Sequence, residues 1–182
     1  TVNILFAGWL DYGRGAEMLL RLADSIANVR ITVAGEGAPS LAEKFKNHPN
    51  CDFKGFVTHH EVLELTKQAH FVFAHYSPHR VINRYAAPNK LAEALAVGRP
   101  AIINSEALVS QAIHENNCGL VSPYGDYKAL KELLQSAIAD QDIYNAMCVN
   151  ARQLFDADYS WSTAKEASRQ VLTTLLQKKK KQ

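Results

Sequence analysis

The feature that most constrains the fold is a regular alternation along the chain. Short runs of β-branched and aromatic apolar residues alternate with longer stretches in which apolar residues recur at helical spacing. This alternation is typical of a parallel sheet covered by helices. We therefore expect an α/β fold, a Rossmann-like parallel sheet with helices on both faces. Its six strands are expected at residues 3–7, 29–34, 51–53, 70–74, 100–104 and 119–122.

Helices are expected between these strands, and local residues mark where some of them begin. Thr58, with Glu61 three residues later, has the spacing of a capping box. Pro88 suits the first turn of a helix, where its missing N–H would have had no partner. Residues 77–87 are expected to be irregular, and Trp161 is expected to anchor the last helix by packing. The expected helices cover residues 15–27, 40–47, 58 onward, 88–98, 106–115 and most of the chain from 126 to about 177, with a break at 156–159.

The length of 182 residues fits one domain with a single core. No internal repeat and no linker rich in Gly, Ser or Pro divides the chain. We therefore expect one domain over residues 1–177, followed by a basic, disordered tail at 178–182. Because the sequence opens directly on a strand, we also expect it to be part of a longer protein.

Charge and cysteine content exclude several classes of protein. The net charge is +2, and four lysines gather at 178–181, so the body is near neutral and no nucleic-acid partner is expected. The lysine run would allow peripheral contact with an anionic membrane surface. The three cysteines are widely spaced, which indicates neither a disulfide framework nor a zinc knuckle. We expect a cytoplasmic protein, and the lysine run makes the inner face of the membrane its alternative location.

Turn residues gather where ligands of open parallel sheets bind, beyond the carboxyl ends of the strands. Flexible turns there can bring backbone N–H groups close to a phosphate, although glycine at a strand end can equally serve the turn alone. Neither glycine cluster is a dinucleotide fingerprint, and no Gly-Lys-Ser/Thr phosphate loop occurs. The glycines after the first two expected strands are Gly8, Gly13, Gly15, Gly35 and Gly37.

The most informative stretch is residues 88–103, Pro-Asn-Lys-Leu-Ala-Glu-Ala-Leu-Ala-Val-Gly-Arg-Pro-Ala-Ile-Ile. A helix N-terminus with Lys90 could hold a diphosphate. Glu93, one turn further on, could accept hydrogen bonds from a vicinal diol such as ribose. The same spacing also fits a solvated pair on a helix surface.

This stretch resembles the C-terminal donor-binding domain of GT-B retaining glycosyltransferases, the group 1 or family 4 class, in its variant with Pro-Asn-Lys-Leu before the glutamate. Other segments resemble the family in order and spacing along nearly the whole chain. They are residues 4–8 with Leu10, Arg14 and Gly15, and residues 33–37, 53–57, 117–121, 150–152 and 159–161.

The resemblance implies that a nucleoside-diphosphate sugar lies across the strand ends. Glu93 matches the glutamate that binds the ribose hydroxyls, and Arg14 matches a cation that stabilises the departing phosphate. Arg14 and Lys90 are thus the expected catalytic residues. The expected donor-binding residues are Gly8, Gly35, Gly37, Phe56, Val57, Tyr85, Pro88, Asn89, Lys90 and Glu93.

Two positions depart from the family pattern. Tyr85 stands where the family often has a second glutamate, and Trp9 stands where it often has a phosphate-binding arginine. Arg14 is then the main phosphate cation unless Arg80 or Arg84 contributes. Because charge on the leaving diphosphate has to be stabilised, the loss of one cation would change rate or donor preference.

The implied function is sugar transfer in polysaccharide biosynthesis to an acceptor held by an N-terminal half, so this domain alone is expected to be inactive. No cofactor and no metal are expected. His75 and His79 are four residues apart, but the Ser77-Pro78 pair between them argues against a helix that would align them. Two alternatives stay open. One is half of a GT-B sugar-nucleotide 2-epimerase, and the other is a non-catalytic nucleotide-sugar or protein-interaction module.

Overall fold

The computed structural model describes residues 1–179, and six strands form one parallel sheet. The strand order is β3-β2-β1-β4-β5-β6, so the direction of winding reverses between β1 and β4. Ligands of open α/β sheets bind at such a reversal. The predicted α/β class and all six predicted strands are confirmed. The strands are β1 (Val2–Ala7), β2 (Val29–Ala34), β3 (Cys51–Gly55), β4 (Phe71–Ala74), β5 (Ala101–Asn104) and β6 (Gly119–Ser122).

The helices follow the predicted alternation with several differences, which include the 3-10 turn η1 (Tyr12–Arg14) and a break at Asp140. A short helix, α4, forms within the stretch expected to be irregular, and α6 begins four residues later than expected. The described helices are η1 (Tyr12–Arg14), α1 (Ala16–Ser25), α2 (Pro39–Lys46), α3 (His59–Gln68), α4 (Val81–Arg84), α5 (Asn89–Ala96), α6 (Ser110–Glu115), α7 (Tyr127–Ala139), α8 (Gln141–Leu154), the π-helical turn η2 (Phe155–Tyr159) and α9 (Trp161–Lys179).

The late start of α6 follows from contacts that the preceding turn makes with other loops. The Glu106 carboxylate accepts hydrogen bonds from the Asn104 side chain and from the Tyr124 backbone N–H. The Leu108 N–H donates to the Arg84 carbonyl at 2.7 Å. Residues 105–109 are therefore tied as a turn to the neighbouring loops, and Glu106 caps that turn instead of starting a helix.

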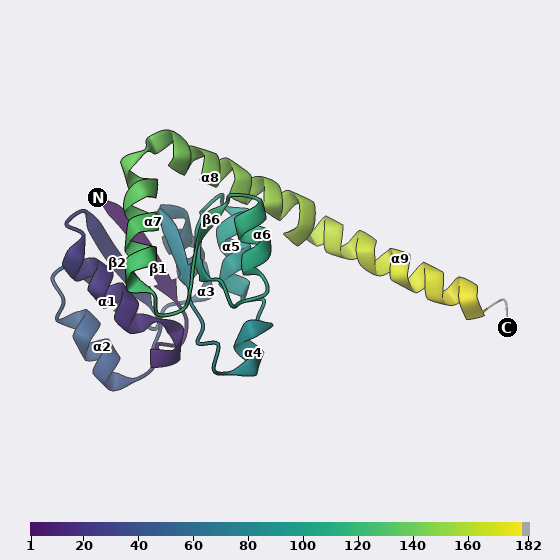
Figure 1. Ribbon diagram of the computed structural model, residues 1–182. Coiled ribbons are helices and arrows are strands. Elements are labelled where there is room, and N and C mark those ends of the chain that lie inside the picture. The colour runs from purple at the N-terminus through teal and green to yellow at the C-terminus, as the bar shows by residue number, and fades with distance from the viewer. Residues whose placement is uncertain (180–182) are drawn as a thin grey trace.

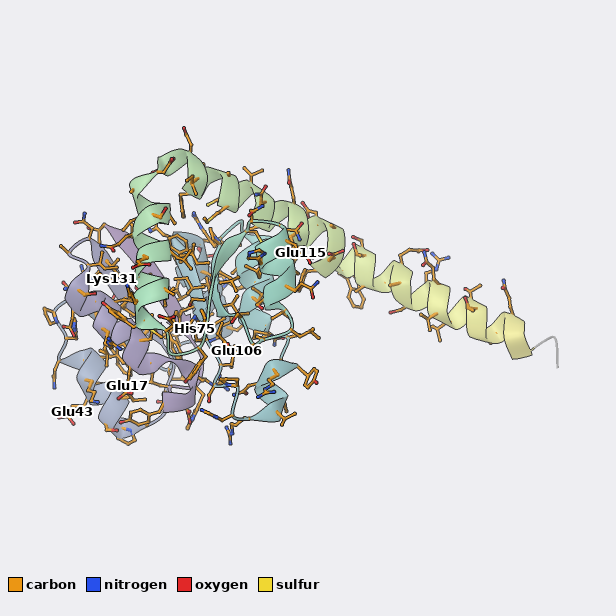
Figure 2. The ribbon with its side chains drawn as sticks, viewed as in Figure 1. Glu17, Glu43, His75, Glu106, Glu115 and Lys131 are labelled. Atoms are coloured by element: carbon orange, nitrogen blue, oxygen red, sulfur yellow. The ribbon has the colours of Figure 1, made fainter. Side chains whose placement is uncertain are left out.

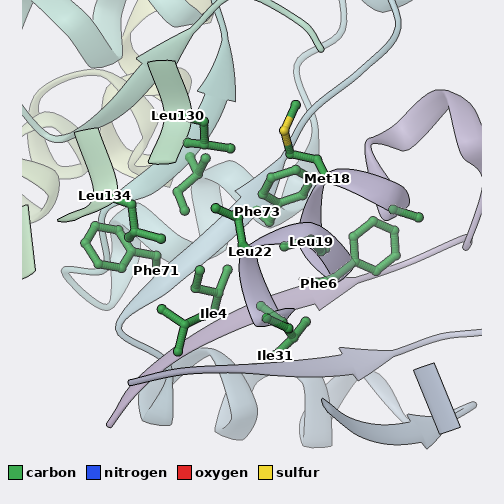
Figure 3. Close-up of a cluster of buried hydrophobic side chains, with 14 of the residues drawn as sticks. Ile4, Phe6, Met18, Leu19, Leu22, Ile31, Phe71, Phe73, Leu130 and Leu134 are labelled. Carbon is green, nitrogen blue, oxygen red and sulfur yellow. The ribbon is translucent and has the colours of Figure 1, made fainter. Parts of the chain in front are cut away.

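Alternate residues of the central strands face opposite sides of the sheet. Ile4 and Phe6 of β1 pack under α1 and α7, together with Leu22 and Leu134 (Figure 3). Leu5 and Ala7 point to the other face, which α3 and α5 cover. Burying one such side chain stabilises the fold by about 1.5–3 kcal/mol, so two covered faces hold the strand ends in fixed positions.

Most charged side chains lie outside this core. Figure 2 shows Glu17, Glu43 and Glu115 on the outside of the helices, where they are exposed. His75, by contrast, is buried and stacks on Phe73 with ring centroids 4.6 Å apart. Burial lowers the pKa of His75 to about 4, so this ring is neutral at pH 7. His79 is exposed, and the two histidines do not form a pair.

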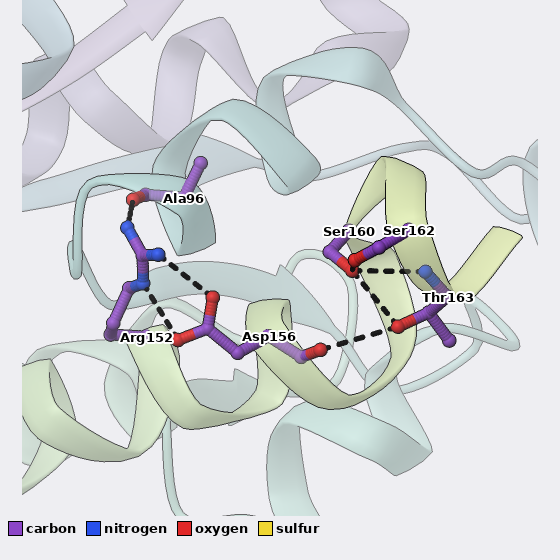
Figure 4. Close-up of polar contacts among 6 residues, drawn as sticks. All are labelled: Ala96, Arg152, Asp156, Ser160, Ser162 and Thr163. Carbon is purple, nitrogen blue, oxygen red and sulfur yellow. Dashed lines mark hydrogen bonds and ion pairs between the residues drawn. The ribbon is translucent and has the colours of Figure 1, made fainter. Parts of the chain in front are cut away.

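The junction of α8 and α9 is fixed by polar contacts (Figure 4). The Arg152 guanidinium donates to the Asp156 carboxylate and to the Ala96 carbonyl, at 2.8 Å each. These bonds hold the end of α8 against the end of α5. The expected break at 156–159 is a π-helical turn, after which Ser160 accepts a hydrogen bond from the Thr163 N–H.

Helix α9 extends away from the body of the domain (Figure 1). Trp161 is 80% exposed, so the prediction that it packs as an anchor is wrong for this domain. The expected tail at 178–182 begins inside α9, and its residues 180–182 lie outside the described residues.

Candidate functional site

Two cavities adjoin at the carboxyl edge of the sheet, where the strand order reverses. The larger has a volume of about 580 Å³ and is called here the charged cavity. The smaller, of about 330 Å³, is called the apolar cavity. Both are lined by Gly8 and Val62, so one extended ligand can occupy them together.

A close contact between two turns forms the floor that the cavities share. Gly8, after β1, has φ of 125° and donates its N–H to the Ala34 carbonyl at 2.8 Å. Gly35, after β2, has φ of 144°, and a Cβ there would overlap the Gly8 carbonyl oxygen. Position 35 therefore accepts only glycine. The absence of a side chain there lets the end of β2 lie directly against the turn after β1.

Two cations stand over Gly8 in the charged cavity. A Cβ built on Gly8 would lie 3.7 Å from Nη1 of Arg14 and 3.8 Å from Nζ of Lys90. Lys90 Nζ also lies 4.6 Å from the centre of the Phe6 ring, and the Arg14 guanidinium lies 5.6 Å from that of Tyr76. The aromatic faces attract both cations and hold them beside one another despite their like charge.

This environment changes the protonation of Lys90. Burial, and then the like charge of Arg14, lower the pKa of Lys90 from 10.5 to about 7, and the nearby Glu93 carboxylate offsets part of that effect. A bound anion would favour the protonated form. The pair is therefore suited to a ligand that brings negative charge.

Helix α5 presents its N-terminus to the charged cavity. Pro88 precedes the helix as its N-cap, one position earlier than expected, and Asn89 is the first helical residue. Both line the cavity. The first N–H groups of a helix have no partner within it and carry partial positive charge, which favours an anion here.

Glu93 lies one turn further along α5 and contacts α3. Its Oε1 lies 3.2 Å from Nε2 of His59, and its side chain is 22% exposed while that of His59 is 66% exposed. Because a carboxylate only accepts hydrogen bonds, Nε2 of His59 carries the donated hydrogen. Glu93 is thus the acidic group of an otherwise basic cavity.

The structure brings most of the predicted donor-binding residues together. Gly8, Arg14, Pro88, Asn89, Lys90 and Glu93 line the charged cavity, and Gly8, Gly35, Phe56 and Val57 line the apolar one.

Two predicted residues lie apart from both cavities. Gly37 packs against Leu10, where a Cβ would overlap the Leu10 carbonyl, so its role is the close approach of two loops. Tyr85 is 70% exposed and lines neither cavity.

The structure also distinguishes between the two further candidate cations, Arg80 and Arg84, and locates Trp9. Arg80 lines the charged cavity, whereas Nε of Arg84 donates to the Pro78 carbonyl at 3.0 Å. Arg80 is therefore the further cation available to a ligand, and Arg84 holds its own loop. Trp9 lines the apolar cavity beside Phe56.

Sequence reasoning missed several residues that line the charged cavity or, as His59 does, contact its lining residue Glu93. Tyr76 follows β4 at the edge already singled out, so its position alone could have identified it. His59 follows the capping residue Thr58 and could have been found because α3 also begins at this edge. Ile82 and Asn83 also line the charged cavity, and they belong to α4, a helix that no local sequence pattern predicted.

Residues 1–179 contain neither a cluster of metal ligands nor a membrane-spanning helix. In this part of the chain no three His, Cys, Asp or Glu side chains lie together as metal ligands. Across the same residues, no helix combines the length and apolar character needed to cross a bilayer.

Comparison with known proteins agrees with this architecture. A family model described as glycosyl transferases group 1 matches residues 2–154. No curated protein matches the chain. The C-terminal domain of the group 1 glycosyl transferase LpcC from Francisella tularensis has a TM-score of 0.72 at 16% identity, over 88% of this chain and 87% of that one.

Two longer proteins share the fold as well. Anabaena HepE in complex with UDP has a TM-score of 0.80 at 13% identity, over 96% of this chain and 49% of HepE. WaaG, a glycosyltransferase involved in lipopolysaccharide biosynthesis, has a TM-score of 0.67 at 26% identity, over 91% of this chain and 46% of WaaG. The chain thus spans about half the length of HepE and of WaaG.

Proposed function

Because the chain belongs to the group 1 glycosyl transferase family, we propose that it binds the nucleoside-diphosphate sugar donor of such a transferase at the carboxyl edge of its sheet. The observation that carries this proposal is the pair of cations, Arg14 and Lys90, over Gly8, with Glu93 one turn further along α5. This arrangement offers positive charge to a diphosphate and an acceptor to a diol in one cavity.

The donor spans both cavities in this proposal. The diphosphate lies over Gly8 between Arg14, Lys90 and the first turn of α5, and the ribose hydroxyls donate to Glu93. The base lies in the apolar cavity, where the ring of Phe56 and the side chain of Val57 can pack on it. Two features support this path: the cavities adjoin at Gly8 and Val62, and HepE, which has the same fold, forms a complex with UDP.

In this proposal, the chemical role of the chain is to stabilise the diphosphate leaving group. When the bond between the anomeric carbon and the phosphate oxygen breaks, negative charge develops on the diphosphate. Fixed cations aimed at that charge are worth most in a site that excludes water. In this proposal Arg14 and Lys90 take this role, supported by their common position in the charged cavity, which Arg80 also lines. Retention of the anomeric configuration is part of the proposal through the family resemblance alone.

The acceptor belongs to an N-terminal half of the same protein in this account. The chain spans about half the length of HepE and of WaaG, and α9 presents exposed apolar side chains away from the body, including Trp161, Leu172 and Leu176. Holding the acceptor hydroxyl at the reacting carbon can supply about 7–11 kcal/mol of the barrier. The isolated domain therefore binds the donor and transfers no sugar.

The family match favours a transferase over a sugar-nucleotide 2-epimerase. A non-catalytic module would bind the same ligand but would remain inactive after it is joined to an N-terminal half. Measuring transfer from labelled donor sugars by the joined protein separates these two functions, since the proposal requires acceptor-dependent transfer by the joined protein.

Location at the inner face of a membrane is a further part of the proposal. It rests on the lysines at 178–181. Each basic residue near an anionic surface contributes about 1 kcal/mol. Sedimentation with vesicles that contain phosphatidylserine tests it, and equal recovery with neutral vesicles would remove this part.

Calorimetric titration of the chain with UDP, GDP, ADP and dTDP tests donor binding. A ligand that binds only the folded state stabilises it by about 2.7 kcal/mol at a hundred times its dissociation constant. We expect one nucleotide to bind more tightly than the others. No binding of any of the four at millimolar concentration would contradict the proposed function.

A further inference from the structure

The contact between His59 and Glu93 joins the first residue of one helix to the interior of another. Helix α3 begins with a complete capping box: Thr58 accepts from the Glu61 N–H at 3.3 Å, and Glu61 accepts from the Thr58 N–H at 2.7 Å. The backbone at His59 is therefore fixed before any ligand arrives. From that position the imidazole reaches across to Glu93 on α5.

The partner of Glu93 is notable because a cation is nearer in sequence. Lys90 lies one turn earlier on α5, at a spacing that often gives an ion pair. Among the described residues, however, Glu93 pairs with His59 and lies within ion-pair distance of no other cation. The Glu93 carboxylate is thus turned toward α3, while the Lys90 ammonium lies above Gly8.

The contact uses one of the two carboxylate oxygens. Oε1 accepts from Nε2 of His59 at 3.2 Å, and Oε2 has no partner among residues 1–179. Each carboxylate oxygen can accept more than one hydrogen bond, so a diol can still bind while His59 stays in contact. A glutamate side chain otherwise loses rotamer freedom when it binds a ligand, and a contact made in advance reduces that cost.

We infer that His59 is a positioning residue that holds Glu93 in the orientation that accepts the ribose hydroxyls. This inference rests on the proposed function, in which Glu93 binds ribose. His59 acts through Glu93 alone: it contributes to affinity only when the ligand carries the 2′ and 3′ hydroxyls. The requirement is for a side chain that donates one hydrogen bond to Glu93.

The neighbouring residue supplies a matched control. His60 is also exposed and also lies in the first turn of α3, but it makes no side-chain hydrogen bond among the described residues. Exchange of either histidine for alanine removes an exposed imidazole from the first turn of α3. Only His59→Ala removes the contact with Glu93.

The experiment compares the ratio of two dissociation constants. The probes are the tightest-binding of UDP, GDP and ADP and the 2′,3′-dideoxy form of that nucleotide. We expect His59→Ala to lower the preference for the ribose form by about three- to tenfold, the effect of one hydrogen bond. His59→Gln, whose amide N–H can donate to Glu93, should retain most of the preference, and His60→Ala should leave it unchanged.

A double-mutant cycle completes the test. In a chain that carries Glu93→Ala, the further change His59→Ala should have no effect on the ratio, because the two residues act as one unit. An unchanged ratio in His59→Ala, or the same loss in His60→Ala, would overturn the inference. Failure of the unaltered chain to bind any of the nucleotides would instead overturn the proposed function.

Discussion

The two cavities at the carboxyl edge share a floor but differ in what lines them. The charged cavity is formed by side chains of η1 and α5 that carry opposite charges, Arg14 and Lys90 against Glu93. The apolar cavity is formed by a glycine turn, Trp9 and the residues after β3, including Phe56. In the proposed function, the charged cavity binds the diphosphate and the sugar hydroxyls of the nucleotide. The apolar cavity then contacts the base, which differs from one nucleotide to another.

The largest effect that this comparison predicts is at Glu93. Glu93→Ala should weaken nucleoside-diphosphate binding by about ten- to a hundredfold, because a charge-assisted hydrogen bond is worth roughly 1.5–3 kcal/mol. Calorimetry measures this change, with Glu115→Ala, an exposed glutamate of α6, as the control. A dissociation constant equal to that of the unaltered chain would remove the ribose role.

The next effect is at Arg14. Arg14→Ala should weaken diphosphate binding by about tenfold, monophosphate binding by less and nucleoside binding not at all, because a guanidinium forks onto phosphate oxygens. Arg30→Ala, an exposed arginine at the start of β2, is the control. Equal weakening of all three ligands would indicate damage to the turn that bears Arg14.

Lys90 should give the charged cavity a pH dependence that the apolar cavity lacks. Its pKa is about 7 in the free protein, and a bound diphosphate favours the protonated form. Above pH 7, binding therefore takes up a proton, and affinity should fall by about tenfold at most for each pH unit. Phosphate groups titrate near pH 6, so the measurement belongs between about pH 7.5 and 9. Lys90→Gln should bind more weakly and show a flat profile in this range.

The smallest effect lies in the apolar cavity. Phe56 is 77% exposed in the free protein and offers one ring face to a base. Phe56→Ala should weaken nucleotide binding by about fivefold, the lower end for a stacked base, and should change the ranking of the four bases. Binding of pyrophosphate should not change. A variant that loses pyrophosphate affinity as well would show that the two cavities do not act separately.

The sequence predicted the parts of the molecule that depend on periodic burial and local turns. Strand β2 begins and ends at the predicted residues, and the capping box of Thr58 and Glu61 is present. Six residues that line the charged cavity were also predicted, and four of them, Pro88, Asn89, Lys90 and Glu93, come from one continuous stretch.

The predictions that failed, or were not made, concern features that depend on contacts between residues distant in sequence. The late start of α6 follows from the bonds of Glu106 with Asn104 and Tyr124, which no pattern around residue 106 reveals. Trp161 was expected to pack, but α9 extends from the body and leaves it exposed. The contact of His59 with Glu93 joins residues 34 positions apart, so only the packing of α3 on α5 could reveal it.

The central claim is that one nucleotide occupies both cavities of this chain. Backbone amide chemical shifts during titration with the tightest-binding nucleoside diphosphate test it most directly. The account predicts that the largest shifts fall at Gly8, Gly35, Phe56, Asn89 and Lys90, while Arg30 and Lys54, which lie outside both cavities, stay unchanged. Largest shifts at Arg30 and Lys54, with none at Gly8 or Lys90, would contradict it.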